Sequence, residues 1–168
     1  MAGEIGHAII DPQGPLGKCG MPGCLEAFIG GPAIASQGEE AIQAGANTLL
    51  KEYQPLTARR VYQVAQEGDK VAQTIVQQVG RYLALALQQL VMFYDVEHIV
   101  LGGGVTQAGP MFLEAILEEW AHLRHLAPLA HEMLKPDMLS LANPSHNMVA
   151  LGAVALVSQG LVINIGSR

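Results

Sequence analysis

The chain has 168 residues, and its 9 Lys and Arg against 15 Asp and Glu give a net charge of −6 at pH 7. Half of the residues are hydrophobic and 14% are charged, which excludes a disordered segment, because disorder requires low hydrophobicity and high charge. The acidic balance, without any Lys/Arg cluster, argues against nucleic-acid binding. A sequence this apolar must bury a large core or cover part of its surface with a partner.

The sequence predicts a soluble, cytoplasmic protein. Its first residues lack the basic region of a secretory signal. The best membrane candidate is the uncharged stretch Met148–Gly166, which polar residues interrupt after Val157. Its apolar run Met148–Val157 is too short to span about 30 Å of hydrocarbon. Cys19 and Cys24 lie five residues apart in a glycine-rich loop, a spacing that favours metal binding in a reducing compartment over a disulfide framework.

The first half of the chain is predicted to be mostly helical. A short strand over His7–Ile10 precedes a loop over residues 12–24, which has too many Gly and Pro for a regular element. Helical patterns follow over Leu25–Ala35 and Gly38–Leu50. Two further helices are expected. Thr57 is the predicted N-cap of a helix that runs to about Gln66, and Asp69–Tyr94 has one apolar stripe at helical spacing.

The second half of the chain predicts an α/β arrangement. A strand over His98–Leu101 leads into a glycine turn, and Pro110 suits the first turn of a helix that carries Met111 through His122. A strand over Met138–Leu141 and an apolar helix over Met148–Val157 follow. The order strand, helix, strand, helix indicates parallel strands, although so few strands make a thin and incomplete sheet.

Three polar residues are candidates for binding a polyhydroxylated ligand: Glu4, His7 and Glu26, which flank the first predicted strand and the first predicted helix. A carboxylate accepts two O–H bonds, and charge-assisted hydrogen bonds are stronger than neutral ones. The alternative is structural, with Glu4 a surface acid and Glu26 favouring the N-terminus of a helix.

The motifs around these residues resemble those of the ROK family of repressors and sugar kinases. GEIGH at residues 3–7 and CGMPGCLE at residues 19–26 carry the resemblance, and GD at 68–69, VLGGGV at 100–105 and ALGAVAL at 150–156 extend it over essentially the whole chain. The resemblance implies a ribonuclease-H-like, actin-like ATPase fold. It also implies that Glu4, His7 and Glu26 bind sugar hydroxyls.

The resemblance further implies a structural zinc ion, held by the histidine and three cysteines in a C-x-C-G-x-x-G-C pattern. Here the first cysteine is replaced by Gly17, which leaves His7, Cys19 and Cys24. Structural zinc sites are almost always four-coordinate, so Asp11 or a water molecule would have to complete the site. The alternative is two thiols without metal, in a loop that is ordered by its prolines.

The glycine turn Gly102, Gly103 and Gly104 is a candidate for nucleotide binding. Backbone N–H groups between a strand and a helix can approach an anion, and the resemblance implies that this turn lies against the adenosine and phosphates of ATP, which the family uses with Mg²⁺. The alternative is a tight connection without a ligand.

A sugar kinase also needs a base and a phosphate cradle, which the resemblance implies as an aspartate after an asparagine and an Asp-Gly-Gly loop. None of the four aspartates of the chain lies in such a pattern. The sequence therefore resembles the C-terminal part of a ROK kinase, without the N-terminal lobe and inactive alone. Surfaces that meet that lobe would be exposed, so a homo-oligomer, or a complex with the missing lobe, is expected.

The leading hypothesis is therefore the C-terminal part of an ATP-dependent hexose kinase of the glucokinase type. The alternatives are the sugar-sensing half of a ROK transcriptional repressor and a stand-alone binding or assembly module. The chain is read as one domain over residues 1–168, divided into a zinc and sugar loop (3–31), a helical segment (32–95) and a nucleotide-facing α/β part (96–168).

Overall fold

The computed structural model of the chain describes residues 3–143 and Val154. Within them lie six α-helices and two strands: α1 (Glu26–Ile29), α2 (Gly31–Gln43), α3 (Ala58–Gln66), α4 (Lys70–Tyr94), β1 (Ile99–Leu101), α5 (Pro110–Leu126), α6 (Pro128–Met133) and β2 (Leu139–Leu141). Short 3₁₀ turns cover Ile5–His7, Leu49–Glu52, Val105–Ala108 and Pro136–Met138.

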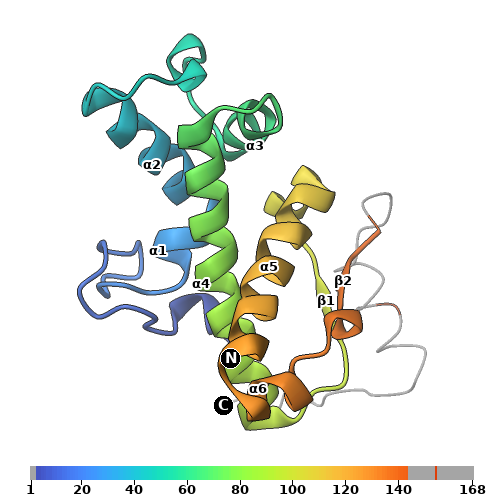
Figure 1. Cartoon of the computed structure of the whole chain (residues 1–168). Coiled ribbons are helices and arrows are strands. Elements are labelled where there is room, and N and C mark those ends of the chain that lie inside the picture. Colours follow the sequence, from blue (N-terminus) through green and yellow to red (C-terminus); the bar gives the residue numbers. More distant parts are fainter. Residues whose placement is uncertain (1–2, 144–153, 155–168) are drawn as a thin grey trace.

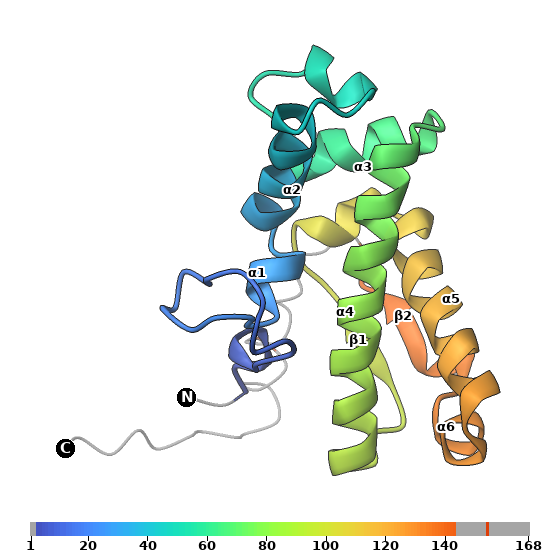
Figure 2. The same cartoon turned by 60° about the vertical axis from the view of Figure 1, so that its left-hand side comes forward.

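Helix α4 runs through the middle of the molecule, with α2 and α3 around one end and α5 alongside the other (Figures 1 and 2). Most of its predicted apolar stripe is buried, from Ala72 to Leu87. The stripe ends before Tyr94, which is exposed. One long helix therefore provides the surface on which the other helices pack.

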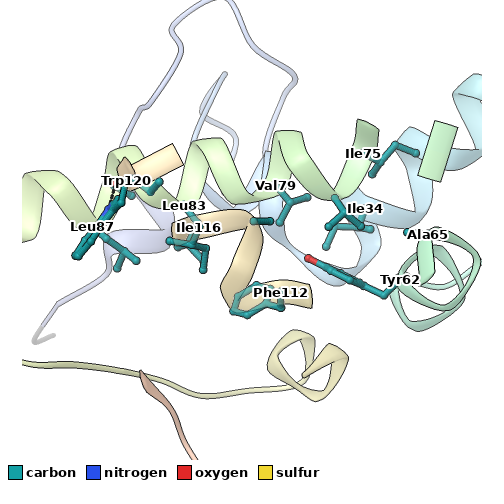
Figure 3. Close-up of a cluster of buried hydrophobic side chains, with 14 of the residues drawn as sticks. Ile34, Tyr62, Ala65, Ile75, Val79, Leu83, Leu87, Phe112, Ile116 and Trp120 are labelled. Carbon is teal, nitrogen blue, oxygen red and sulfur yellow. Dashed lines mark hydrogen bonds between the residues drawn. The ribbon is translucent and has the colours of Figure 1, made fainter. Parts of the chain in front are cut away.

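The contact between α4 and α5 forms the largest part of the core. Figure 3 shows three side chains of α5 facing side chains of α4; they are Phe112, Ile116 and Trp120. Trp120 is fully buried, and its Nε1–H donates a hydrogen bond to the carbonyl of Ala84 over 3.2 Å. The partner satisfies the one polar group of the indole, so burial of its large apolar surface is not offset by an unpaired donor.

The two strands pair in parallel, in the register Ile99↔Leu139, Val100↔Ser140 and Leu101↔Leu141. This confirms the predicted α/β arrangement with a small sheet. Ile99 and Leu101 pack against the core, whereas Val100 points outward with 58% of its surface exposed. Parallel sheets are normally covered on both faces, and the described residues cover one.

The predicted strand over His7–Ile10 is wrong. Ile5–His7 forms a 3₁₀ turn, and the extended pairing is a single antiparallel bridge between Ile9 and Cys24. The segment that faces Ile9 is the end of the glycine- and proline-rich loop, whose turns allow one bridge but no ladder. The apolar residues of this stretch thus belong to one short antiparallel contact between two loop segments, the bridge between Ile9 and Cys24, which we call the clamp.

The boundary between the first two helices is also misplaced in the prediction. The break falls at Gly30, because Gly30 is extended (ψ 147°) and Pro32 occupies the first turn of α2, where proline is favoured. Gly38, read as a helix start, lies inside α2, where a Cβ would meet the Cδ2 of Leu56 at 2.5 Å. The glycine there permits close packing of α2 on the following segment.

Several other expectations are confirmed. Thr57 caps α3 by accepting a hydrogen bond from the N–H of Arg60, and Asp69 caps α4 by accepting one from the N–H of Ala72 at 2.9 Å. Helix α5 begins at Pro110 but continues to Leu126, and α6 was not predicted. The predicted helix over Met148–Val157 lies outside the described residues, apart from Val154. Among the residues that the structure describes, no helix is both long and apolar enough to cross a membrane.

The close approach of α4 and α5 at Gly80 generates a first prediction. A Cβ on Gly80 would lie 2.6 Å from the Cβ and the carbonyl group of Ala115. Replacing Gly80→Val should therefore lower the free energy of unfolding by about 1–3 kcal/mol through overpacking, measured by urea denaturation followed by circular dichroism. Gln77→Val, at an exposed position of the same helix, controls for the helix propensity of valine, and equal stability of the two variants would contradict the prediction.

Asp69 generates a second prediction, on pH. Partial burial of its carboxyl acts to raise its pKa, but hydrogen bonds from the N–H groups of Ala72 and Leu49 outweigh burial, and the net pKa is lowered. A lowered pKa in the folded state adds stability above the unfolded-state pKa of about 3.9, and that stability is lost as the pH falls through the folded value.

Asp69→Ala should therefore be less stable than the unmodified chain by about 1 kcal/mol at pH 7, the usual value of an N-cap. The difference should shrink below about pH 4, where the carboxyl becomes protonated. Urea denaturation from pH 7 to pH 3 measures this, with the exposed Glu97→Ala as the control. A difference that does not change with pH would show that the charge of Asp69 does not contribute.

Candidate functional site

The three predicted sugar-binding residues come together on one side of the molecule. The clamp between Ile9 and Cys24 is reinforced by hydrogen bonds from the N–H of Leu25 to the carbonyl of Ala8 (2.9 Å) and from the N–H of Ile10 to the carbonyl of Gly23 (2.9 Å). These bonds place the start of α1 beside the Ile5–His7 turn.

His7 lies between the two carboxylates. Its Nε2 is 3.9 Å from Oε2 of Glu4, and its Nδ1 is 3.8 Å from Oε2 of Glu26. The side chains of His7, Glu4 and Glu26 are 42%, 59% and 52% exposed, so a ligand can reach all three. An imidazole between two carboxylates presents several acceptors and a donor within a few ångströms, which suits the adjacent hydroxyl groups of a sugar.

His7 is also near both cysteines, as the metal hypothesis requires. One nitrogen of His7 and the sulfur atoms of Cys19 and Cys24 all lie within 4.8 Å of one another, and the two sulfurs are 3.5 Å apart. The loop makes this approach possible because the bridge between Leu16 and Pro22 folds it back on itself. An imidazole and two thiols are the donors that zinc prefers, so the residues fit three of its four positions.

The two cysteines differ in environment. Cys24 is fully buried and Cys19 is exposed, and both thiols are free. Burial raises the pKa of the Cys24 thiol, and the neighbouring Cys19 and Glu26 act in the same direction. A bound cation would offset this, since a coordinating thiol is deprotonated by the metal.

Asp11, considered above as a fourth ligand, is not part of this group. Its Oδ1 accepts a hydrogen bond from the N–H of Gln13 at 3.0 Å, and it lies outside the set of residues able to hold a metal. Asp11 therefore orders the start of the loop by a side-chain to backbone bond typical of turns. Of the two options considered above for the fourth position, Asp11 or a water molecule, Asp11 is not grouped with the other donors in this structure.

The glycine turn lies where the sequence predicts, directly after β1. Gly103 has φ +109°, a conformation that favours glycine, and its carbonyl accepts a hydrogen bond from Oγ1 of Thr106 at 2.7 Å. The turn continues into the 3₁₀ turn Val105–Ala108. It borders a cavity of about 320 Å³ between α3 and the turn, whose lining includes Gly31, Arg59, Tyr62, Gly104 and Gln107.

The contribution of α3 to this cavity was not predicted from the sequence. Arg59 supplies a cation, and Tyr62 supplies a ring whose buried hydroxyl has no hydrogen-bond partner among the described residues. Burial raises the pKa of Tyr62, so its hydroxyl is neutral. Nothing in the local pattern of α3 marks these residues, since Tyr62 has the spacing of a core residue.

A second hollow lies next to Glu26. It has a volume of about 520 Å³ and lies between α2 and the loop of residues 12–24 that carries both cysteines, here called the cysteine loop. Its lining includes Gly17, Lys18, Phe28, Gln37 and Glu40. Gln37 is held by a hydrogen bond from its Nε2 to the carbonyl of Phe28 at 2.9 Å. Glu26 therefore borders a groove with room for a ligand larger than one hydroxyl group.

Comparison with known proteins gives consistent results. The model of the ROK family matches residues 1–160. Over 125 residues the chain is 34% identical to a glucokinase from Halalkalibacterium halodurans, covering 71% of this chain and 38% of that protein. It is 31% identical over 160 residues to an N-acetylmannosamine kinase from Citrobacter koseri, covering 95% and 48%. The chain thus spans about half or less of the length of these relatives.

Solved structures are similar over most of the chain. A ROK hexokinase from Thermus thermophilus matches with a TM-score of 0.71 and 29% identity, over 92% of this chain and 48% of that one. A ROK-family transcriptional regulator, a homologue of the E. coli MLC protein, matches with a TM-score of 0.68 and 33% identity, over 83% and 34%. The fold is that of part of an actin-like ATPase domain.

Proposed function

This chain belongs to the ROK family, and from that premise we propose that it supplies the sugar-hydroxyl contacts and one nucleotide-facing turn of an ATP-dependent hexose kinase of the glucokinase type. The observation that carries the proposal is the position of His7, within 4 Å of the carboxylates of both Glu4 and Glu26 on an exposed face.

In this proposal the two carboxylates accept hydrogen bonds from neighbouring sugar hydroxyls. His7 donates or accepts a hydrogen bond through the ring nitrogen that does not bind the proposed metal ion. A sugar that lacks one of these hydroxyls would leave a desolvated carboxylate unpaired, which disfavours its binding. Selectivity for the sugar therefore arises from polar pairing more than from shape.

We also propose that His7, Cys19 and Cys24 hold a zinc ion. The three donor atoms within 4.8 Å of one another support it. When bound, the ion would cross-link the Ile5–His7 turn to the cysteine loop and fix the ring of His7, which is the ring that faces Glu4 and Glu26. A metal-bound histidine usually donates its other N–H to a carboxylate, and a carboxylate lies beside each ring nitrogen here.

The cavity beside Gly102, Gly103 and Gly104 is the proposed nucleotide site, for ATP with Mg²⁺. Arg59 at its wall supports an anionic ligand there. The backbone of Gly103 and Gly104 leaves room for it, because no atom of the described residues lies within 4 Å of a Cβ at either position. The 168 residues contain no Asp-Gly-Gly sequence and no Asn-Asp pair. The phosphate cradle and the base proposed for the reaction would therefore come from other residues.

A second candidate function is the sugar-sensing half of a transcriptional repressor. The 33% identity to the ROK transcriptional regulator, over 83% of this chain, supports it. Both functions use the same sugar residues, so they differ in the segment to which this chain is joined. A segment with an Asp-Gly-Gly loop would favour the kinase, and a basic helical segment would favour the repressor.

The proposed environment is the reducing cytoplasm, which agrees with two free thiols 3.5 Å apart.

We also propose that the chain associates, with a second copy or with a lobe of the kinase type, because large apolar side chains are exposed: Phe93, Tyr94, Val100, Leu126 and Leu129. Size-exclusion chromatography with light scattering of the purified chain should give a dimer or larger, and a monomer at micromolar concentration would contradict self-association.

Sugar binding is tested by thermal shift on the purified, zinc-replete chain, with a panel of aldohexoses, N-acetylhexosamines and fructose. A ligand at one hundred times its Kd stabilises a protein by about 2.7 kcal/mol, so one sugar should raise the midpoint by several degrees. Glu26→Gln, which keeps the shape and removes the charge, should abolish the shift. Glu52→Gln, at an exposed carboxylate on another turn, should retain it.

The class of sugar that shifts the midpoint identifies the substrate class. If no sugar in the panel raises the midpoint, or if Glu26→Gln responds as the unmodified chain does, then the group around His7 does not bind sugar in this chain and the proposal fails.

A further inference from the structure

The cysteine loop brings a bare backbone position against the metal-binding group. Gly17 is buried, and a Cβ at this position would overlap Sγ of Cys24 and lie 3.3 Å from Sγ of Cys19. The backbone is held there by a hydrogen bond from the N–H of Gly17 to the carbonyl of Met21 at 2.9 Å. A side-chain donor at residue 17 would enter the same group of atoms, and glycine supplies none.

Among the residues that the structure describes, no other side chain closes the group. Across residues 3–143 and Val154, the residues able to hold a metal together are His7, Cys19 and Cys24. The carboxylate of Asp11 accepts a hydrogen bond from the N–H of Gln13. The carboxylates of Glu4 and Glu26 lie within 4 Å of the imidazole of His7 and are not part of the metal-binding group. Cys19 is exposed, so solvent reaches the group from that side.

Zinc bound by three protein donors keeps a fourth position for water or another ligand, whereas structural sites with four protein donors are closed. We propose that the metal site of this chain is open: His7, Cys19 and Cys24 hold the ion, and its fourth position, on the solvent-exposed side of Cys19, takes an exchangeable monodentate donor. The proposal rests on the proposed zinc site and goes beyond it, because it makes the site a place where a small molecule can bind.

The charges around the site indicate the class of donor. Two thiolates and a neutral imidazole already balance the two charges of the ion, and the carboxylates of Glu4 and Glu26 flank His7. An anion would add a further negative charge to a site that is already neutral and bordered by acids. The fourth position therefore favours a neutral donor, water by default and an imidazole-type nitrogen when one is present.

The test uses Co²⁺ in place of zinc, because its visible spectrum reports the donors and the geometry. The whole chain, reduced and kept free of oxygen, should bind one equivalent of Co²⁺ in equilibrium dialysis. Addition of imidazole should then change the d–d bands with saturation, as imidazole replaces water. The thiolate-to-cobalt charge-transfer band should persist, because the two cysteines stay bound.

Two variants at residue 17 distinguish the effect of an added metal ligand from the effect of an added Cβ. Gly17→Cys adds a third thiolate, so its charge-transfer absorbance should rise by about half, and its spectrum should no longer respond to imidazole. Gly17→Ala adds the same Cβ, which would overlap Sγ of Cys24, without adding a sulfur. It therefore controls for displacement of Cys24, and its charge-transfer absorbance should not exceed that of the unmodified chain. If Gly17→Cys does not fold, the imidazole titration of the unmodified chain decides alone.

A cobalt spectrum of the unmodified chain that imidazole does not change would overturn the proposal, because it would mean that a fourth protein donor closes the site. Failure to bind Co²⁺ in dialysis would also overturn it. Neither result bears on the sugar proposal, which is judged by the thermal shift and its loss in Glu26→Gln.

Discussion

The buried stripe of α4 is the feature on which the rest of the structure depends. Helices α2, α3 and α5 pack against it, and the fully buried Trp120 joins it through the carbonyl of Ala84. The candidate site has few helical residues of its own and is attached to this core through α1. There the ring of Phe28 stacks on Tyr82 of α4 with centroids 3.9 Å apart. Glu26, two residues before Phe28, is thereby fixed relative to the central helix.

The site itself depends on local backbone pairing more than on hydrophobic burial. A single bridge between Ile9 and Cys24, with its flanking hydrogen bonds, brings His7, Cys24 and Glu26 together. Each such hydrogen bond contributes about 0.5–1.5 kcal/mol net, and because this segment is short and lacks a ladder, few of them hold it. A metal ion on His7, Cys19 and Cys24 would add a cross-link where few backbone hydrogen bonds stabilise the chain. This is a physical reason for the proposed metal site and the proposed sugar site to share His7.

The long helix and the family to which the motifs point were predictable from the sequence, and the connections between the elements were not. Asp69–Tyr94 has an unbroken apolar stripe that fits one period, and capping residues mark its start, so its bounds are confirmed within a residue. The stretch His7–Ile10 misled because apolar, β-branched residues also suit a clamp between loops. Residues Arg59 and Tyr62 were missed as cavity residues because the approach of α3 to the glycine turn is tertiary. The position of Asp11 outside the metal group likewise depends on the folding of the loop, which sequence spacing alone does not fix.

The junction between α1 and α2 links the two ends of the proposed reaction. Glu26 and Gly30 line the groove beside the sugar residues, and Gly31 lines the cavity beside the glycine turn. The proposed sugar carboxylate and the proposed nucleotide turn are far apart in the sequence, yet the adjacent residues Gly30 and Gly31 line their two hollows. Glycine at Gly30 is constrained by contact, since a Cβ there would lie 2.7 Å from the carbonyl oxygen of Glu26. A side chain at this junction would push against the backbone of Glu26, so the same small residue keeps the helices close and keeps the sugar carboxylate in place.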